Sequence, residues 1–273
     1  MAGTQKILLV GCGKMGGALL RGWLARGLDA SSVVVVEPFA AAAESLRAEL
    51  GVPVVADAAA IPGAFAPDIV VFAVKPQGMD EIVPAYRQHA STGAVVLSIA
   101  AGRPIAYFEG HLGENAAIVR TMPNTPAAVG RGITGACTNA HVDAGQRSAC
   151  QELLEAVGEV VWLQDEAQID AVTAVSGSGP AYVFYMIECM TRAGVEVGLP
   201  EGVAERLARA TVAGAGELAR LSDDPAGVLR QNVTSPGGTT AAALDVLMAE
   251  DGLAPLMARA IAAAERRSRE LAG

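Results

Sequence analysis

The stretch Lys-Ile-Leu-Leu-Val-Gly-Cys-Gly-Lys-Met-Gly at residues 6–16 decides the fold of this chain. An apolar run typical of a buried strand leads directly into Gly11, Gly13 and Gly16, and apolar residues then recur at four-residue intervals, as on one face of a helix. Between a strand and a helix, the first glycine permits a tight turn, the second lets the backbone approach a pyrophosphate, and the third lets the helix lie close to the strand. The stretch therefore predicts a dinucleotide-binding loop, with a glycine-rich turn that serves only packing as the alternative.

Length and composition restrict the kind of protein to which such a loop can belong. The chain has 273 residues, enough for two domains, and 52% of them are hydrophobic against 18% charged, which excludes a disordered protein. Its longest apolar runs, 69–74 and 94–101, are far shorter than the roughly 18 to 20 residues of a membrane span. A net charge of −9 argues against a nucleic-acid partner. We expect a protein without a membrane segment that acts on a small molecule.

The cysteines indicate the cellular compartment. Cys12, Cys137, Cys150 and Cys189 are scattered without CxxC spacing, and the N-terminus lacks the apolar core of a signal peptide. We therefore expect a reduced, cytoplasmic protein without a metal site. Cys12 is interpreted as a small filler of the glycine loop rather than as a reactive thiol.

Short runs rich in Val and Ile alternate with segments of helical periodicity up to residue 163. We expect strands at 6–10, 33–37, 69–74, 95–99, 118–121 and 160–163. Strands that are apolar on both faces and separated by helices form a parallel sheet that is covered on both sides. Residues 1–163 are therefore predicted to form a doubly wound α/β domain of the Rossmann type.

The strand signal disappears after Gln164, and Ala, Leu, Glu and Arg recur at helical spacing from 167 to 271. Turn signals at 177–180, 198–200, 223–225, 235–238 and 252–255 divide this part into several helices. Helices rich in Ala and Gly bury little apolar area by themselves, so they need the surface of a second copy. Residues 164–273 are predicted to form an all-α domain for dimerisation and substrate binding.

Glu37 ends the second expected strand, 24 residues beyond Gly13. At this position an acidic side chain can accept hydrogen bonds from both ribose hydroxyls of NAD, whereas a 2′-phosphate would need Arg or Lys. The nearest downstream base is Arg47, ten residues further on in a helical segment. Glu37 therefore favours NADH, and a solvent-exposed strand end is the alternative.

Three further strands end in short loops at the carboxyl edge of the sheet, where open α/β sheets bind their ligands. The loops are Lys75-Pro76, Ala100-Ala101-Gly102 and Met122-Pro123-Asn124-Thr125-Pro126. We expect them to line a crevice. Lys75 is a candidate for the ribose and phosphate region of the cofactor, with a surface position at a turn as the alternative.

Two glycine-rich loops precede helices in the second domain. They are Ser176-Gly177-Ser178-Gly179-Pro180-Ala181-Tyr182 and Val233-Thr234-Ser235-Pro236-Gly237-Gly238-Thr239-Thr240. Such turns expose backbone donors and the positive end of a helix dipole, which together suit a carboxylate. Ordinary capping and tight packing are the alternative for each loop.

General acids and bases are unusually scarce. The only lysines are Lys6, Lys14 and Lys75, and all three histidines also lie before residue 164. A dehydrogenase of an alcohol or hydroxy acid usually needs a Lys or His to handle the hydroxyl proton. Hydride addition to an iminium carbon needs no such group, because the nitrogen already carries its proton. The scarcity therefore points to imine chemistry.

With these motifs, the chain resembles the pyrroline-5-carboxylate reductase family over almost its whole length. The resemblance rests on residues 11–16, 73–76, 122–126, 176–182 and, above all, Ser-Pro-Gly-Gly-Thr-Thr at 235–240. It implies an N-terminal Rossmann domain, a helical domain that interlocks with its counterpart in a homodimer, and frequent assembly of such dimers into larger oligomers. It also implies reduction of 1-pyrroline-5-carboxylate to L-proline by NADPH or NADH, the last step of proline biosynthesis.

The resemblance also implies roles for individual residues. Ser235 and the backbone of Gly238 and Thr239 are expected to hold the substrate carboxylate, and the Thr240 hydroxyl to bond the ring nitrogen, so that Ser235 and Thr240 are the catalytic candidates. The cofactor-side residues are expected to be Gly11, Gly13, Lys14, Met15, Gly16, Glu37, Ala73, Lys75, Pro76, Ala100 and Asn124. Because the family commonly prefers NADPH, the acidic Glu37 puts that preference in question.

Two other functions are compatible with parts of this sequence. A two-domain hydroxyacid dehydrogenase would want a lysine in the helical domain, and this chain has none there. A dinucleotide-sensing or scaffold protein would keep the fold without the chemistry, but the retained Ser235, Thr239 and Thr240 speak against it.

Overall fold

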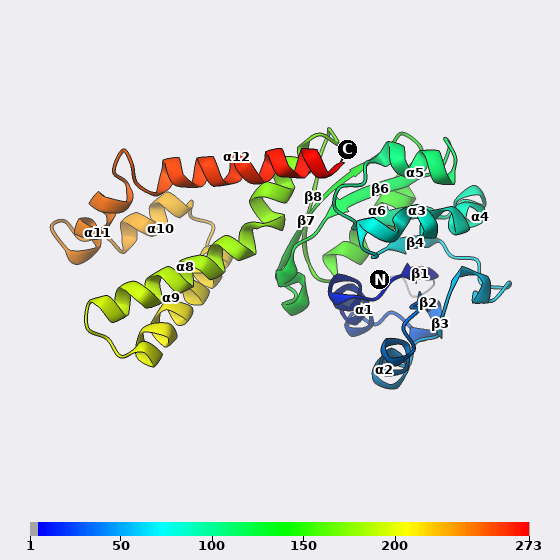
Figure 1. Cartoon of the computed structure of the whole chain (residues 1–273), viewed down its shortest axis with the longest axis horizontal. Helices are drawn as coiled ribbons and strands as arrows, with labels where there is room; N and C mark the ends of the chain where they lie inside the picture. The colour runs from blue at the N-terminus through cyan, green and yellow to red at the C-terminus, as the bar shows by residue number, and fades with distance from the viewer. Residues whose placement is uncertain (1–4, 273) are drawn as a thin grey trace. The chain divides into compact units, whose positions relative to one another are not determined.

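The computed structural model describes residues 5–272 of the chain, which form two compact units (Figure 1). One unit contains the chain up to Gly177 together with the end of the last helix from Glu265, and the other contains Ser178–Ala264. The first unit thus extends beyond the domain boundary expected after residue 163, which stays a prediction.

The first unit is built on one eight-stranded sheet with the order β3-β2-β1-β4-β5-β6-β7-β8. All neighbouring strands run parallel except β6 and β7, which are antiparallel. The strands are β1 (Ile7–Val10), β2 (Val33–Val36), β3 (Val54–Val55), β4 (Ile69–Phe72), β5 (Val95–Ser98), β6 (Ile118–Met122), β7 (Gly132–Thr138) and β8 (Gly158–Trp162). This order, with helical crossovers, confirms the doubly wound fold.

Apolar residues cover both faces of this sheet, as continuous Val and Ile runs require. Alternate residues of β1 point to opposite sides, so that Ile7 and Leu9 lie in one core and Leu8 and Val10 in the other. The first core is closed by α1 (Lys14–Ala25), α2 (Ala40–Leu50) and α6 (Ala144–Glu155). The second is closed by α3 (Met79–Ile82), α4 (Arg87–Ser91), α5 (Ile105–Leu112) and α7 (Gln168–Val172), together with the short turn at Val83–Tyr86.

Two strands were not expected from the sequence. β3 has only two residues, and β7 has the sequence Gly-Ile-Thr-Gly-Ala-Cys-Thr, which lacks a Val-rich run. Gly135 of β7 is required by a neighbour, because a Cβ there would lie 2.8 Å from Cγ1 of Val172 in α7. The strand therefore carries small residues where a helix packs against it.

The second unit contains only helices among its described residues, as predicted. They are α8 (Gly179–Glu196), α9 (Glu201–Leu221), α10 (Ala226–Asn232), α11 (Thr239–Leu247) and the larger part of α12 (Leu253–Ala272). The helices are separated at the turn signals read from the sequence. Within the described residues no helix is both long and apolar enough to cross a membrane.

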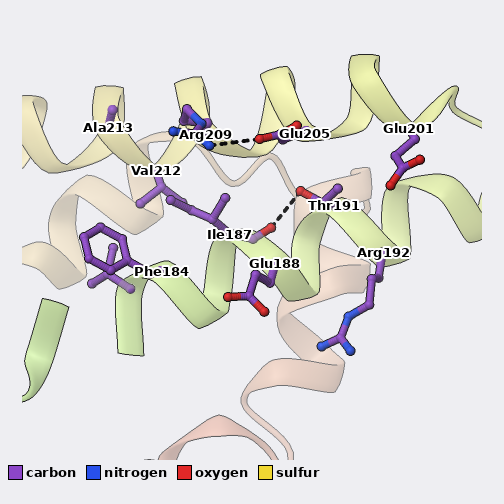
Figure 2. A pocket seen from close by; sticks show the side chains of 11 residues that line it. Phe184, Ile187, Glu188, Thr191, Arg192, Glu201, Glu205, Arg209, Val212 and Ala213 are labelled. Atoms are coloured by element: carbon purple, nitrogen blue, oxygen red, sulfur yellow. Dashed lines mark hydrogen bonds and ion pairs between the residues drawn. The ribbon is translucent and has the colours of Figure 1, made fainter. Parts of the chain in front are cut away.

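The second unit buries very few of its apolar side chains. Within residues 178–264 only Ala204 and Ala208 are buried hydrophobic residues, whereas Phe184 and Tyr185 are 60% and 59% exposed. A groove of about 770 Å³ lies along α8 and α9, with Ile187 and Val212 between the two helices (Figure 2). Such an open apolar surface cannot form a core by itself and needs a covering partner.

The close approach of β7 and β8 generates a stability prediction. Gly158 opens β8 with a φ of +155°, directly opposite Gly132, and a Cβ on Gly158 would overlap the backbone of Gly132. We expect Gly158→Ala to lower the free energy of unfolding by more than about 3 kcal/mol, because strain and overlap act together. Gly63→Ala, where a Cβ meets nothing within 4 Å, is the control. Equal melting curves for both variants, measured by circular dichroism, would contradict this packing.

Candidate active site

The glycine loop is packed directly against the end of β4. A Cβ on Gly11, whose φ is +85°, would lie 2.6 Å from Cγ1 of Val74 and 3.0 Å from the carbonyl oxygen of Ala73. A Cβ on Gly16 would lie 2.7 Å from the Gly11 carbonyl oxygen and 3.0 Å from Cβ of Ala73. Both positions therefore require glycine, as the spacing predicted, and Ala73 belongs to the same packing.

Gly13 differs from these two glycines because it faces open space. It caps α1 in an extended conformation, no side chain caps the helix, and a Cβ at this position would meet nothing within 4 Å. The first helical bond runs from the Gly17 N–H to the Gly13 carbonyl at 2.8 Å. The N–H groups of Lys14, Met15 and Gly16 consequently have no acceptor within the helix. This uncapped helix start fits the pyrophosphate of a dinucleotide.

Glu37 lies beside this loop with only 6% of its surface exposed. Its Oε2 accepts a hydrogen bond from the Cys12 N–H at 3.2 Å, and its Oε1 accepts one from the Phe39 N–H at 3.2 Å. The alternative of a solvent-exposed strand end is therefore wrong. Burial, reinforced by the Glu37 carboxylate, raises the pKa of the Cys12 thiol to about 11, so this thiol is protonated near neutral pH and fits the role of a filler.

A cavity of about 380 Å³ opens next to Gly11, at the carboxyl ends of β1 and β2. Its charged lining residues are Asp57 and Glu81, and no lysine or arginine belongs to its described lining. Tyr86 also lines it, and burial, with a smaller contribution from Asp57, raises the pKa of the phenol above its usual range. The cavity is thus acidic and partly apolar.

Further cofactor-side candidates lie at the carboxyl ends of β4 and β5. Lys75 is exposed and precedes the short helical turn Pro76–Gly78, whose Pro76 carbonyl accepts a hydrogen bond from Arg103 at 3.0 Å. Ala100 is buried, and its N–H donates to Oγ of Ser98 at 3.2 Å. The structure therefore brings these residues to the same edge of the sheet as the glycine loop.

Asn124 follows β6 at this edge, and both ends of its side-chain amide are bonded to the protein. Oδ1 accepts from the Ile133 N–H at 3.0 Å, and Nδ2 donates to the Ser176 carbonyl at 3.2 Å. Ser176 belongs to a π-helical turn at Thr173–Gly177 between α7 and α8. Sequence reasoning missed this link, because Gly-Ser-Gly-Pro signals a loop but not the π-turn that leads into it.

The Ser235–Thr240 loop lies in the second unit and forms a tight turn before α11. Its Pro-Gly pair and a φ of +67° at Gly237 are typical of a type II turn, closed by a 3.0 Å bond from the Gly238 N–H to the Ser235 carbonyl. No side chain caps α11, whose first bond runs from the Ala242 N–H to the Gly238 carbonyl at 3.2 Å. The N–H groups of the first turn therefore remain available to an anion.

Comparison with known proteins places this geometry in a family. Residues 166–271 match the family model described as pyrroline-5-carboxylate reductase dimerisation, and residues 6–102 match the one described as NADP oxidoreductase coenzyme F420-dependent. A curated pyrroline-5-carboxylate reductase of Pseudomonas aeruginosa is 42% identical over 98% of this chain and 97% of its own length. The chain belongs to the pyrroline-5-carboxylate reductase family.

Solved structures agree with this assignment. The pyrroline-5-carboxylate reductase of Coxiella burnetii is similar with a TM-score of 0.94 and 36% identity over 99% of both chains. The Plasmodium falciparum pyrroline carboxylate reductase with NADP bound is similar with a TM-score of 0.82 and 28% identity, again over 99% of both chains.

Membership of the family confirms several expectations drawn from the sequence. The resemblance, the two-part fold class and an oxidoreductase that uses NAD(P)H are confirmed. The expected reaction, reduction of 1-pyrroline-5-carboxylate to L-proline as the last step of proline biosynthesis, is confirmed as well. The match to a dimerisation domain confirms the homodimer and accounts for the open apolar surface of α8 and α9.

Gly13→Ala tests the phosphate loop without disturbing the fold. Because a Cβ at this position meets nothing within 4 Å, we expect an unchanged melting temperature. The new methyl group would stand where the backbone approaches the pyrophosphate, so the Kd for NADH and NADPH should rise at least about tenfold in a fluorescence titration. Gly63→Ala is the control. An unchanged Kd in Gly13→Ala would show that the pyrophosphate binds elsewhere.

Proposed function

We propose that imine reduction uses two binding sites, each at the start of a helix. The glycine loop at the start of α1 binds the pyrophosphate of NAD(P)H, and the Ser235–Thr240 loop at the start of α11 binds 1-pyrroline-5-carboxylate. The observation that carries this proposal is the uncapped start of α11, whose first N–H groups have no acceptor within the helix. Ser235, Thr239 and Thr240 lie at this start in the sequence, and residues 164–273 contain no lysine or histidine.

The cofactor-side residues act mainly through their backbone. Gly11 and Gly16 fix the loop against β4, and Gly13 leaves the N–H groups of Lys14, Met15 and Gly16 open to the pyrophosphate. Ala73, Lys75, Pro76, Ala100 and Asn124 are proposed to border the rest of the cofactor along the sheet edge. NAD(P)H, when bound, supplies a hydride to the imine carbon.

The substrate carboxylate is proposed to bind at the start of α11. The donors are the Thr239 N–H and the Ser235 hydroxyl, with the Gly238 N–H shared in a three-centre bond between the carboxylate and the Ser235 carbonyl. The positive end of the helix dipole favours the negative charge. The Gly238 N–H also holds the turn through the Ser235 carbonyl, so the loop is shaped before substrate arrives. This preorganisation lowers the cost of binding.

Thr240 is proposed to orient the ring nitrogen. Its hydroxyl accepts a hydrogen bond from the protonated imine and so holds the ring carbon in position for the hydride. The nitrogen keeps its proton when the carbon gains the hydride, so no lysine or histidine has to act as acid at this step. Catalysis then rests on orientation, which is worth several kcal/mol when the reacting atoms are held at contact distance.

Ser235→Ala tests the carboxylate site. A charge-assisted hydrogen bond contributes about 1.5 to 3 kcal/mol, so KM for pyrroline-5-carboxylate should rise roughly tenfold or more. Thr234→Val is the matched control from the same loop, since the Thr234 hydroxyl donates to the Arg230 carbonyl at 2.7 Å instead. A wild-type KM in Ser235→Ala, or an equal rise in both variants, would remove the proposed role.

Thr240→Val tests the orientation of the ring nitrogen. The two side chains have nearly the same size, so the loss is confined to one hydroxyl, and we expect kcat to fall about tenfold or more. Steady-state kinetics at saturating substrate measure this directly. If kcat stays at the wild-type value, the ring nitrogen is held by another group.

We also propose that the enzyme uses NADH at least as well as NADPH. Glu37 lies beside the glycine loop, and the neighbouring cavity carries the carboxylates of Asp57 and Glu81 without a lining base among its described residues. A 2′-phosphate near this group of carboxylates would be repelled and would lack a cationic partner. Arg47 does not line this cavity, and its guanidinium donates to the Val54 carbonyl at 2.8 Å.

Two substitutions at Glu37 distinguish the effect of its charge on cofactor preference from the effect of its hydrogen bonds on the loop. Glu37→Gln keeps an amide oxygen that can accept from the backbone N–H groups of Cys12 or Phe39, whereas Glu37→Ser removes that support as well. Both should raise the ratio of kcat/KM for NADPH to that for NADH, by roughly tenfold for Glu37→Gln. A wild-type kcat/KM for NADPH many times that for NADH, unchanged in Glu37→Gln, would contradict the proposal.

The cytoplasm is the proposed location. The proposal is supported by four free cysteines, of which Cys137 and Cys150 are buried. Fractionation of cells that express the full chain tests it, and recovery in a membrane or secreted fraction would contradict it.

A further inference from the structure

Thr173–Gly177 is a π-helical turn whose last residue, Gly177, lies against Met122 at the carboxyl end of β6. π-turns inside helices occur often at functional sites. Its last two residues, Ser176 and Gly177, are also the first two of the glycine-rich loop that begins α8. The position of this turn therefore sets where the loop starts.

Two glycines let the turn and the helix before it approach the sheet closely. A Cβ on Gly177 would lie 2.6 Å from Cε of Met122, the last residue of β6. A Cβ on Gly135 would lie 2.8 Å from Cγ1 of Val172, the last residue of α7. A side chain at Gly135 would require the branched Val172 to move, whereas at Gly177 only the flexible end of Met122 would have to shift.

Asn124 adds a directional link to this packing. The residue is 8% exposed. Its Oδ1 accepts a hydrogen bond from the Ile133 N–H at 3.0 Å, and its Nδ2 donates one to the Ser176 carbonyl at 3.2 Å. Only an amide offers an acceptor and a donor at these two ends. An aspartate would keep the first bond but turn a carboxylate oxygen toward the Ser176 carbonyl.

The position of Asn124 in the sheet relates it to the nicotinamide half of the cofactor. The acidic cavity and Glu37 belong to the β1 and β2 side, which suits the adenosine half of a dinucleotide. In doubly wound sheets the cofactor crosses the switch point, which here lies between β1 and β4, so its nicotinamide half extends toward β4, β5 and β6. Asn124 follows β6 at this edge and is therefore near the reacting half of the cofactor.

We propose that Asn124 is a positioning residue for hydride transfer, which acts by holding the Ser176 carbonyl and with it the start of the glycine-rich loop at the carboxyl end of β6. This inference rests on the proposed function. It assigns Asn124 an effect on the rate of the chemical step rather than on the affinity for the cofactor. A displacement of about 1 Å around reacting atoms can reduce a rate a hundredfold, so a lost tether has a large effect on kcat.

The test is Asn124→Asp in the full-length dimer, with pyrroline-5-carboxylate and NADH. We expect kcat to fall at least about tenfold while the Kd for NADH stays within about twofold of wild type. The primary deuterium isotope effect on kcat, measured with NADH deuterated at C4, should rise, because hydride transfer becomes slower relative to the other steps. A merely structural role would not change the isotope effect.

Asn139→Asp is the matched control. Asn139 joins the same two strands at the opposite edge of the sheet, where Oδ1 accepts from the Ile118 N–H at 3.1 Å and Nδ2 donates to the Ala116 carbonyl at 2.8 Å. We expect this variant to lose thermal stability but to keep kcat and the isotope effect.

Two outcomes for Asn124→Asp overturn the inference. A wild-type kcat in Asn124→Asp shows that the tether does not matter, and a raised Kd with a normal kcat shows that Asn124 binds the cofactor directly. If Asn124→Asp does not fold, Gly135→Ala decides, because its Cβ would displace Val172, the residue directly before the turn, without changing Asn124. A reduced kcat with unchanged Kd supports the inference, and a normal kcat overturns it. Wild-type protein without imine reduction would instead overturn the proposed function.

Discussion

The contact between the glycine loop and the end of β4 is the constraint on which the rest of the first unit depends. Gly11 and Gly16 lie so close to Ala73 and Val74 that any side chain would push α1 off the sheet. Because α1 is held there, its uncapped N–H groups face the carboxyl edge of the sheet beside Glu37. The parallel pairing of β1 with β4 places this contact at the switch point where a dinucleotide crosses.

The second unit depends on a different constraint, the small size of its side chains. Ala204 and Ala208 are the hydrophobic residues that α9 buries, while apolar side chains of α8 remain open to solvent in the single chain. Alanine contributes little burial, so we expect these helices to need the surface of a second copy. The match to a dimerisation domain agrees with these exposed apolar faces.

Periodicity and spacing in the sequence predicted much of this architecture. The Val-rich strands, the glycine loop and the helix breaks are each determined by residues that are close together in the sequence. β7 was missed because its strand is rich in glycine and threonine, which the packing of α7 requires. The contacts of Glu37 and Asn124 were missed because they join residues 25 and 52 positions apart, and such pairs follow from tertiary geometry that no local pattern encodes.

A crystal structure of the dimer with proline and oxidised cofactor tests the central claim most directly, since it shows both helix starts with their ligands. The account predicts the pyrophosphate on the N–H groups that follow Gly13, the proline carboxylate on Ser235 and Thr239, and the ring nitrogen at the Thr240 hydroxyl. A carboxylate bound by the Ser176–Tyr182 loop or by a lysine or arginine, with the start of α11 empty, would contradict it.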